Sequence, residues 1–196
     1  MVDAFLLSFA VILIAELGDK SQLMALAFAT RYRAFTVLTA VTIATLLVHA
    51  GSVLLGSAVA LALPTGLINV LAGIAFFAFA AWTLRGDVLG EEEQSRARRD
   101  GRWALVTIGT AFFLAELGDK TMLATITLAT TEEPIGTWLG STAGMVAADA
   151  IAIGIGALLG TRLPERAIRW FAAAAFVVFG VILVAQGLGL FGAGAA

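Results

Sequence analysis

The sequence predicts an all-α integral membrane protein with six transmembrane helices, arranged as two inverted three-helix repeats. Three observations predict this fold class. The 196 residues are 60% hydrophobic and only 13% charged, which is not the composition of a soluble domain of this length. The apolar residues form long runs that short breaks separate. The two halves of the chain also repeat one another at an offset of one hundred residues.

Each of the six predicted helices is an apolar segment long enough to cross the hydrocarbon core of a bilayer. Most of the breaks between them contain proline, which costs no hydrogen bond at a helix start. The first segment has no basic region before it and contains charged residues, so we interpret it as a retained helix and not as a signal peptide. The six segments are residues 4–30, 36–62, 66–85, 103–130, 136–160 and 165–188.

One substantial hydrophilic stretch follows the third predicted helix and contains the sequence EEEQSRARRDGR. We interpret residues 86–102 as a charged cytoplasmic linker. It joins a first three-helix repeat, residues 1–85, to a second three-helix repeat, residues 103–196. Because each repeat has an odd number of spans, the second copy enters the membrane from the opposite face. Inverted repeats of this kind are typical of transporters.

The arginines indicate the orientation of the chain. If the six spans alternate, all ten arginines fall on one side of the membrane. The positive-inside rule makes that side cytoplasmic, which places both termini on the periplasmic or extracellular side. The two remaining basic residues, apart from the single histidine, are Lys20 and Lys120, and both lie inside predicted spans.

The first and fourth predicted helices carry the most informative feature of the chain. The segment ELGDK at residues 16–20 recurs at residues 116–120, and the sixteen residues starting at 15 and 115 share nine identities. Charged side chains at the centre of a span cost about 2.5–3.5 kcal/mol each on insertion scales, so they mark functional sites. The inverted repeat predicts that the acidic residues of both copies surround one locus, and these are Glu16, Asp19, Glu116 and Asp119.

The local geometry of the motif has two interpretations. On a continuous helix, Glu16, Asp19 and Lys20 share one face. Gly18, on the opposite side, permits either the close approach of another helix or a local break that frees carbonyl groups as ligands. The sequence does not distinguish these two.

Charge counting favours a functional role for the motif over a structural one. In the structural interpretation, Glu16 pairs with Lys20 and the pair only locks two helices together. Each copy, however, holds two acids and one lysine, so the two copies together carry a charge of −2 when ionised. A buried charge without compensation takes up protons or a cation. Competition between a divalent cation and protons for the same carboxylates is the basis of cation/proton exchange.

The surrounding donors favour a hard cation. Ser21, Gln22 and Thr121 add oxygen atoms to the carboxylates, and oxygen ligands favour Ca²⁺, Mn²⁺ or Mg²⁺ over Cu⁺ or Zn²⁺. The chain has no cysteine. For Met24 and Met122, core packing is favoured over a role as soft ligands. We predict no resident cofactor.

The second and fifth predicted helices carry the next candidates. His49 and Asp149 occupy equivalent positions near the middle of their spans. We predict a role in proton coupling or gating for both, and a buried aspartate is the stronger candidate because ionisable residues in spans are functional sites by default. For Asp149, three roles remain open: a direct cation ligand, a partner for Lys20 or Lys120, or the proton carrier.

With Ser21 and Thr121 after the lysines, the two motifs resemble the E-x-G-D-[KR]-[ST] signature of the Gdt-type cation/proton exchangers. This family includes Golgi calcium/manganese transporters and bacterial manganese exporters, and the resemblance covers the chain end to end. It implies export of Mn²⁺, with Ca²⁺ next, from the cytosol in exchange for protons. It also implies that the four motif acids hold the ion, that Ser21 and Thr121 line the site, and that Lys20 and Lys120 tune or gate it. The size of the chain and the lack of an organellar targeting segment favour a bacterial member in the cell inner membrane.

Two other functions are weighed against this one. An exporter of a cationic or zwitterionic metabolite, such as a basic amino acid, would also use buried carboxylates. An intramembrane enzyme acting on a lipid phosphate is disfavoured, so we assign no catalytic residues, and we expect no nucleic-acid partner. The sequence leaves open the preferred cation, the proton stoichiometry, the resting conformation and whether the chain works as a monomer or a homodimer.

Overall fold

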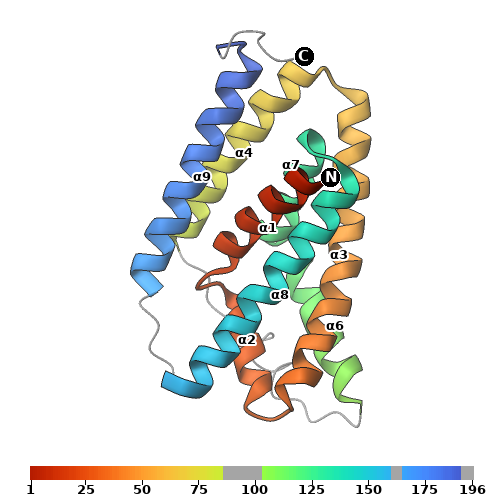
Figure 1. Cartoon of the computed structure of the whole chain (residues 1–196), viewed down its shortest axis with the longest axis vertical. Helices are drawn as coiled ribbons and strands as arrows, with labels where there is room; N and C mark the ends of the chain where they lie inside the picture. Colours follow the sequence, from red (N-terminus) through yellow and green to blue (C-terminus); the bar gives the residue numbers. More distant parts are fainter. Residues whose placement is uncertain (86–102, 160–164, 191–196) are drawn as a thin grey trace.

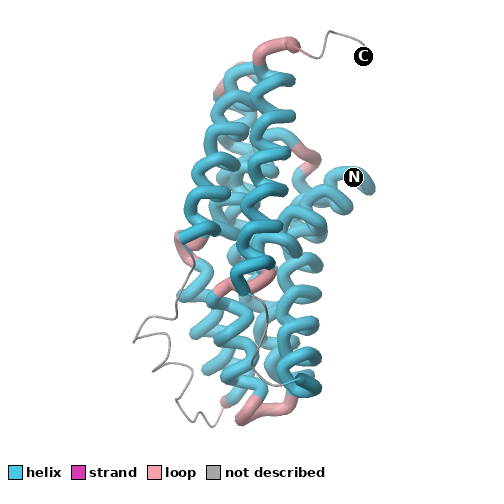
Figure 2. Tube along the Cα trace, turned by 90° about the vertical axis from the view of Figure 1, so that its left-hand side faces the viewer, coloured by secondary structure: helices cyan, strands magenta, loops and turns pink. Residues whose placement is uncertain are grey.

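The computed structural model describes residues 1–85, 103–159 and 165–190, and all regular secondary structure in these ranges is α-helical. The helices form an elongated bundle (Figure 2). The predicted linker, residues 86–102, lies outside the described residues. The helices are α1 (Val2–Glu16), α2 (Lys20–Ala29), α3 (Ala34–Ala62), α4 (Thr65–Arg85), α6 (Ala104–Glu116), α7 (Lys120–Thr131), α8 (Pro134–Leu159) and α9 (Glu165–Gly187).

Four of the six predicted segments are single helices. The bounds of α3, α4, α8 and α9 agree with the predicted ones to within two residues. Pro64 lies directly before α4 and Pro134 is the first residue of α8, as expected for a residue without a backbone N–H. Among the described residues, α3, α4 and the part of α9 from Arg169 to Gly187 are long and apolar enough to cross a membrane, and α6 is a shorter apolar helix.

The first and fourth predicted segments are each broken at the repeated motif. Gly18 and Gly118 have φ angles of 77° and 80°, in the left-handed region that glycine adopts most easily. Leu17 and Leu117 are extended, so α1 and α6 end at the motif glutamates. The continuous-helix geometry is therefore wrong, and the local break is the correct alternative. Irregular backbone at membrane depth is tolerated where protein surrounds it.

The two halves of the chain pack against one another in a reciprocal way. Helix α1 lies along α8 while α6 lies along α3, and α2 contacts α8 while α7 contacts α3. Helices α4 and α9 pack side by side at one edge of the bundle (Figure 1). Exchanging the halves turns the α1–α8 pair into α6–α3 and the α2–α8 pair into α7–α3, while the α4–α9 pair turns into itself. Two equivalent units produce this pattern.

Figure 1 also shows how the chain alternates between the two ends of the bundle. The starts of α1 and α4 and the ends of α3 and α9 lie in its upper half, while the starts of α3 and α6 lie at the lower end. The loop with Arg31 and Arg33 lies between α2 and α3 at this lower end. The segment between α7 and α8, which contains Glu132 and Glu133, lies toward the opposite end.

Apolar side chains fill the bundle on both sides of the motifs. One cluster joins α2, α3 and α6 and includes Met24, whose side chain is buried. The prediction of core packing is confirmed for Met24. A second cluster joins α1, α4, α7, α8 and α9, where the Phe76 and Phe176 ring centroids lie 5.8 Å apart.

Close contact between α1 and α8 depends on glycine. A Cβ atom added at Gly140 would lie 2.3 Å from the carbonyl oxygen of Phe5. Additions at Gly136 and Gly144 would lie 2.4 and 2.6 Å from the carbonyl oxygens of Met1, directly before α1, and Phe9. Three glycines at a spacing of four residues therefore let the two backbones touch. This contact fixes α1, and with it the position of Glu16 at the end of α1.

Candidate cation site

Because of the two helix breaks, four helix ends lie at the motif side chains. Glu16 and Glu116 are the last residues of α1 and α6, while Asp19 and Asp119 precede the first residues of α2 and α7. The carboxyl end of a helix favours a cation and the amino end favours a carboxylate. The broken backbone therefore stabilises the aspartates and, at the glutamates, adds to the attraction for a positive ion.

Carboxylates from both motifs meet in one buried cluster. Oxygen atoms of Glu16, Glu116 and Asp119 all lie within 4.8 Å of one another, and each of these residues is at most 3% exposed. An ion with oxygen ligands at about 2.3–2.6 Å holds opposite ligands about 5 Å apart. The spacing of the cluster thus suits a divalent cation of this size.

The lysines of the motifs form ion pairs that cross between the halves. Nζ of Lys120 lies 2.5 Å from Oδ1 of Asp19, and Nζ of Lys20 lies 3.0 Å from Oδ1 of Asp119. The first pair is the more deeply buried, because the side chain of Lys120 is 5% exposed and that of Lys20 is 17% exposed. Each lysine therefore neutralises the aspartate of the other motif.

The two glutamates have different surroundings despite their equivalent positions. Glu16 accepts hydrogen bonds from the hydroxyl groups of Ser21 and Thr121, one on each carboxylate oxygen. Neither carboxylate oxygen of Glu116 has a hydrogen-bond partner among the described residues. The site is therefore asymmetric, and of the two glutamates it is Glu116 that can bind a ligand without breaking a hydrogen bond.

Gln22 and Met122, which occupy equivalent positions, also differ. The side-chain oxygen of Gln22 accepts from the Gly18 N–H at 2.8 Å, and its side-chain nitrogen donates to the Ala148 carbonyl at 2.9 Å. Met122 instead accepts from the Gly118 N–H through its sulfur at 3.1 Å. Both ends of the Gln22 amide are thus hydrogen-bonded to the backbone.

Asp149 and His49 lie buried in α8 and α3. Asp149 follows Ala148, the residue to whose carbonyl Gln22 donates. Both of its carboxylate oxygens lack a hydrogen-bond partner in the part of the chain that the structure describes. Nδ1 of His49 lies 3.5 Å from the hydroxyl of Thr142. Both residues are fully buried.

Thr45 and Met145, which lie where α3 crosses α8, were not among the predicted site residues. The hydroxyl of Thr45 donates to the sulfur of Met145 at 3.1 Å, so two equivalent positions of the repeat contact one another. His49 and Thr142 lie on one side of this crossing and Asp149 lies on the other. The offset of one hundred residues could have indicated this pair, because Thr45 and Met145 occupy equivalent positions in the two halves of the sequence.

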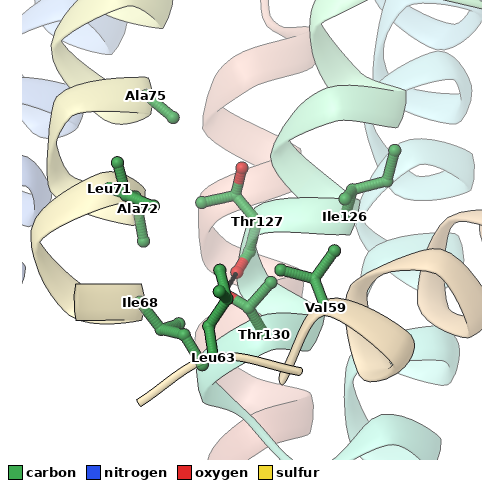
Figure 3. Close-up of a pocket in the computed structure, with 9 residues that line it drawn as sticks. All are labelled: Val59, Leu63, Ile68, Leu71, Ala72, Ala75, Ile126, Thr127 and Thr130. Atoms are coloured by element: carbon green, nitrogen blue, oxygen red, sulfur yellow. Dashed lines mark hydrogen bonds between the residues drawn. The ribbon is translucent and has the colours of Figure 1, made fainter. Parts of the chain in front are cut away.

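A cavity of about 140 Å³ lies away from the carboxylates, between the end of α3, α4 and α7. Figure 3 shows that aliphatic side chains and the hydroxyl groups of Thr127 and Thr130 line it. No ionisable side chain lines this cavity. This cavity therefore has no charged group that would bind a cation. The motif carboxylates remain the candidate cation site.

Apolar helices that enclose carboxylates from two related halves define a class of protein, the multi-pass membrane transporters of ions. The chain belongs to the divalent cation/proton antiporter GDT1 family, whose profile matches residues 4–91 and residues 104–190. The family assignment from the motif resemblance is therefore confirmed. Each of the two matched ranges contains one ELGDK motif.

Individual relatives come from bacteria and plants. The chain is 33% identical over 181 residues to a Vibrio cholerae protein described as a "Putative manganese exporter", covering 91% of this chain and 88% of that one. It is 28% identical over 200 residues to a GDT1-like protein of Synechocystis sp., covering 93% and 97%. It is 29% identical over 208 residues to the rice GDT1-like protein 2, chloroplastic, covering 91% of this chain and 60% of the rice protein. No solved structure matches the chain.

Proposed function

We propose that this protein is a secondary transporter that exports Mn²⁺ from the cytosol in exchange for protons, with Ca²⁺ as the next candidate. The observation that carries the proposal is the buried cluster of Glu16, Glu116 and Asp119, to which both motifs contribute. The family supports a divalent cation and protons as substrates. The description of the Vibrio cholerae relative supports manganese and the outward direction.

Charge balance provides the mechanism of exchange. Four motif acids and two motif lysines leave a charge of −2 when all are ionised, and one divalent cation neutralises it. When the cation leaves, protons replace it, because a buried carboxylate without compensation favours its neutral form. The cation and the protons therefore exclude one another from the same site, which couples their movements.

Each motif residue has a separate role in this proposal. The cation ligands are Glu16, Asp19, Glu116 and Asp119. Ser21 and Thr121 line the site and hold Glu16 through their hydroxyl groups. Lys20 and Lys120 neutralise the aspartates in the empty site and move aside when the cation binds. We assign proton coupling to Asp149 and gating to His49, whose buried polar atoms have few partners among the described residues.

The proposed orientation in the membrane follows from the arginines. We propose six spans in two inverted repeats, of which the first and fourth are the broken pairs α1–α2 and α6–α7. The end of the bundle with Arg31 and Arg33 faces the cytosol. Both termini then lie on the periplasmic side of the cell inner membrane.

Transport in proteoliposomes tests the proposed function. A pH gradient is imposed, and Mn²⁺ and Ca²⁺ fluxes are measured for the wild type and for Glu16→Gln, Asp19→Asn, Glu116→Gln, Asp119→Asn and Asp149→Asn. We expect the four motif variants to lose cation movement. Glu133→Gln, which changes a carboxylate outside the site, serves as the matched control and keeps the wild-type flux.

Two results would contradict the proposal. Wild-type flux in both Asp19→Asn and Asp119→Asn would show that the shared carboxylates are not the ion site. Transport of a basic amino acid that is insensitive to Mn²⁺ and Ca²⁺ would instead favour the export of a cationic metabolite.

A further inference from the structure

Gln22 joins the helix break of the first motif to the helix that carries Asp149. Its oxygen accepts from the N–H of Gly18, inside the break, and its nitrogen donates to the carbonyl of Ala148, the residue before Asp149. Gln22 is 4% exposed and Asp149 is fully buried. A single side chain thus spans from the hinge of the cation motif to the turn of α8 that positions a second buried acid.

The second half of the chain lacks this connection for a chemical reason. Met122, the equivalent residue, satisfies the Gly118 N–H with its sulfur at 3.1 Å. A thioether accepts a hydrogen bond but has no hydrogen to donate. Met122 therefore cannot hold the carbonyl of Val48, which is the counterpart of Ala148 in α3. Of the two breaks, the first is tied to the opposite half through this position and the second is not.

We propose that Gln22 is a positioning residue that couples the conformation of the first motif to that of Asp149, and that it is not a cation ligand. When a cation draws Glu16 and Asp19 together, the break moves, and the Gln22 amide transmits this movement to the backbone of α8. Met122 leaves the second break free to move along α3. The proposal rests on the proposed function, because it assumes that a cation binds the motif and that Asp149 takes part in proton movement.

The test uses the inequivalence of the two halves. Gln22→Met places in the first half the residue that the second half has at the equivalent position. The Met sulfur can still accept a hydrogen bond from the Gly18 N–H, whereas the hydrogen bond to the Ala148 carbonyl is lost. Met122→Gln is the reciprocal change, and it supplies a donor at the half-buried equivalent position in α7. Proton and Mn²⁺ fluxes are measured together in proteoliposomes, with a pH-sensitive dye and a Mn²⁺-sensitive dye.

We expect Gln22→Met to lower the number of protons moved per Mn²⁺, because the proton assigned to Asp149 is no longer coupled to the first motif through the bond to Ala148. The KM for Mn²⁺ stays within about twofold of the wild type, because no ligand is removed. A raised KM with an unchanged ratio would make Gln22 a ligand and overturn the proposal, and so would wild-type values for both quantities.

Met122→Gln keeps the proposal testable if Gln22→Met fails to fold. We expect this variant to turn over more slowly, with an unchanged ratio of protons to Mn²⁺, because the second break becomes tied to α3. Wild-type turnover would overturn the proposal. The wild type itself separates the two proposals. If the wild type moves Mn²⁺ without protons, the proposed function fails. If the wild type and Gln22→Met move the same number of protons per Mn²⁺, only the role of Gln22 is refuted.

Discussion

The substitution Lys120→Met tests the cross-half ion pairs. Lys120 lies 2.5 Å from Asp19, and the two side chains are 5% and 0% exposed. Removing one partner of a buried ion pair costs about 3–5 kcal/mol. For a protein of this length, such a loss lowers the midpoint of thermal unfolding by about 6–20 °C. We expect this decrease in protein without a divalent cation.

Mn²⁺ should reverse most of the effect. In the proposed mechanism the cation supplies the positive charge that Lys120 provides in the empty site, so it binds Lys120→Met more tightly than the wild type. A ligand that binds the folded state more tightly raises its stability more at the same concentration. The assay is thermal unfolding of the purified protein in detergent, with and without Mn²⁺, for both proteins.

Lys20→Met is the matched control for this experiment. Its ion pair with Asp119 is longer, at 3.0 Å, and its side chain is 17% exposed, so water screens the pair more and a smaller decrease is expected. The reasoning would be refuted if Lys120→Met unfolded at the wild-type temperature, or if Mn²⁺ raised the midpoints of the wild type and the variant equally.

The remaining predictions concern the helix breaks, the helix contacts and the loop before α8. Gly18→Ala and Gly118→Ala force a side chain into the left-handed region and should each cost about 1–2 kcal/mol in free energy of unfolding. Gly140→Ala should cost about 1–3 kcal/mol, because its Cβ meets the Phe5 carbonyl at 2.3 Å. Gly51→Ala, whose Cβ meets nothing within 4 Å, should be neutral or stabilising, and denaturation curves compare the four. Hydrogen bonds from the backbone N–H groups of Gly136 and Ile135 lower the pKa of Glu133 from 4.5. A lowered pKa stabilises the folded state above the unfolded value and the effect is lost as pH falls through the folded value. The difference in unfolding midpoint between the wild type and Glu133→Gln should therefore be present at pH 7, begin to decrease as pH falls below 4.5, and be lost once pH falls below the lowered pKa of the folded state.

The helix bounds could be predicted because apolar runs and prolines mark them directly. Pro64 and Pro134 lie at helix starts in the sequence and in the structure. The meeting of the motif acids could also be predicted, since the repeat gives both copies equivalent places in the fold. This prediction concerns only the positions of the motif acids. Their roles as cation ligands are part of the proposed function.

The helix breaks could not be predicted, because a glycine at this position fits either a continuous helix or a break. Gly18 is compatible with a close helix contact and with a left-handed turn, and only the surrounding packing selects between them. Gly136, Gly140 and Gly144 make the close contact instead. Their spacing of four residues was the available signal.

The inequivalence of the two glutamates also could not be read from the sequence. Ser21 and Thr121 follow their lysines in the same way, so symmetry predicts one hydroxyl for each glutamate. In the structure both hydroxyl groups donate to Glu16. A local motif predicts which groups are near one another, whereas the choice among partners depends on side-chain rotamers on four separate helices.

The stoichiometry of cation binding tests the central claim most directly. Isothermal titration of the purified protein with Mn²⁺ counts the ions bound per chain, for the wild type and for Glu16→Gln and Glu116→Gln. A single site made by both halves predicts one Mn²⁺ per chain, and it predicts that either substitution abolishes this binding. Two ions per chain, with each substitution removing only one of them, would mean that each motif binds independently and would contradict the shared site.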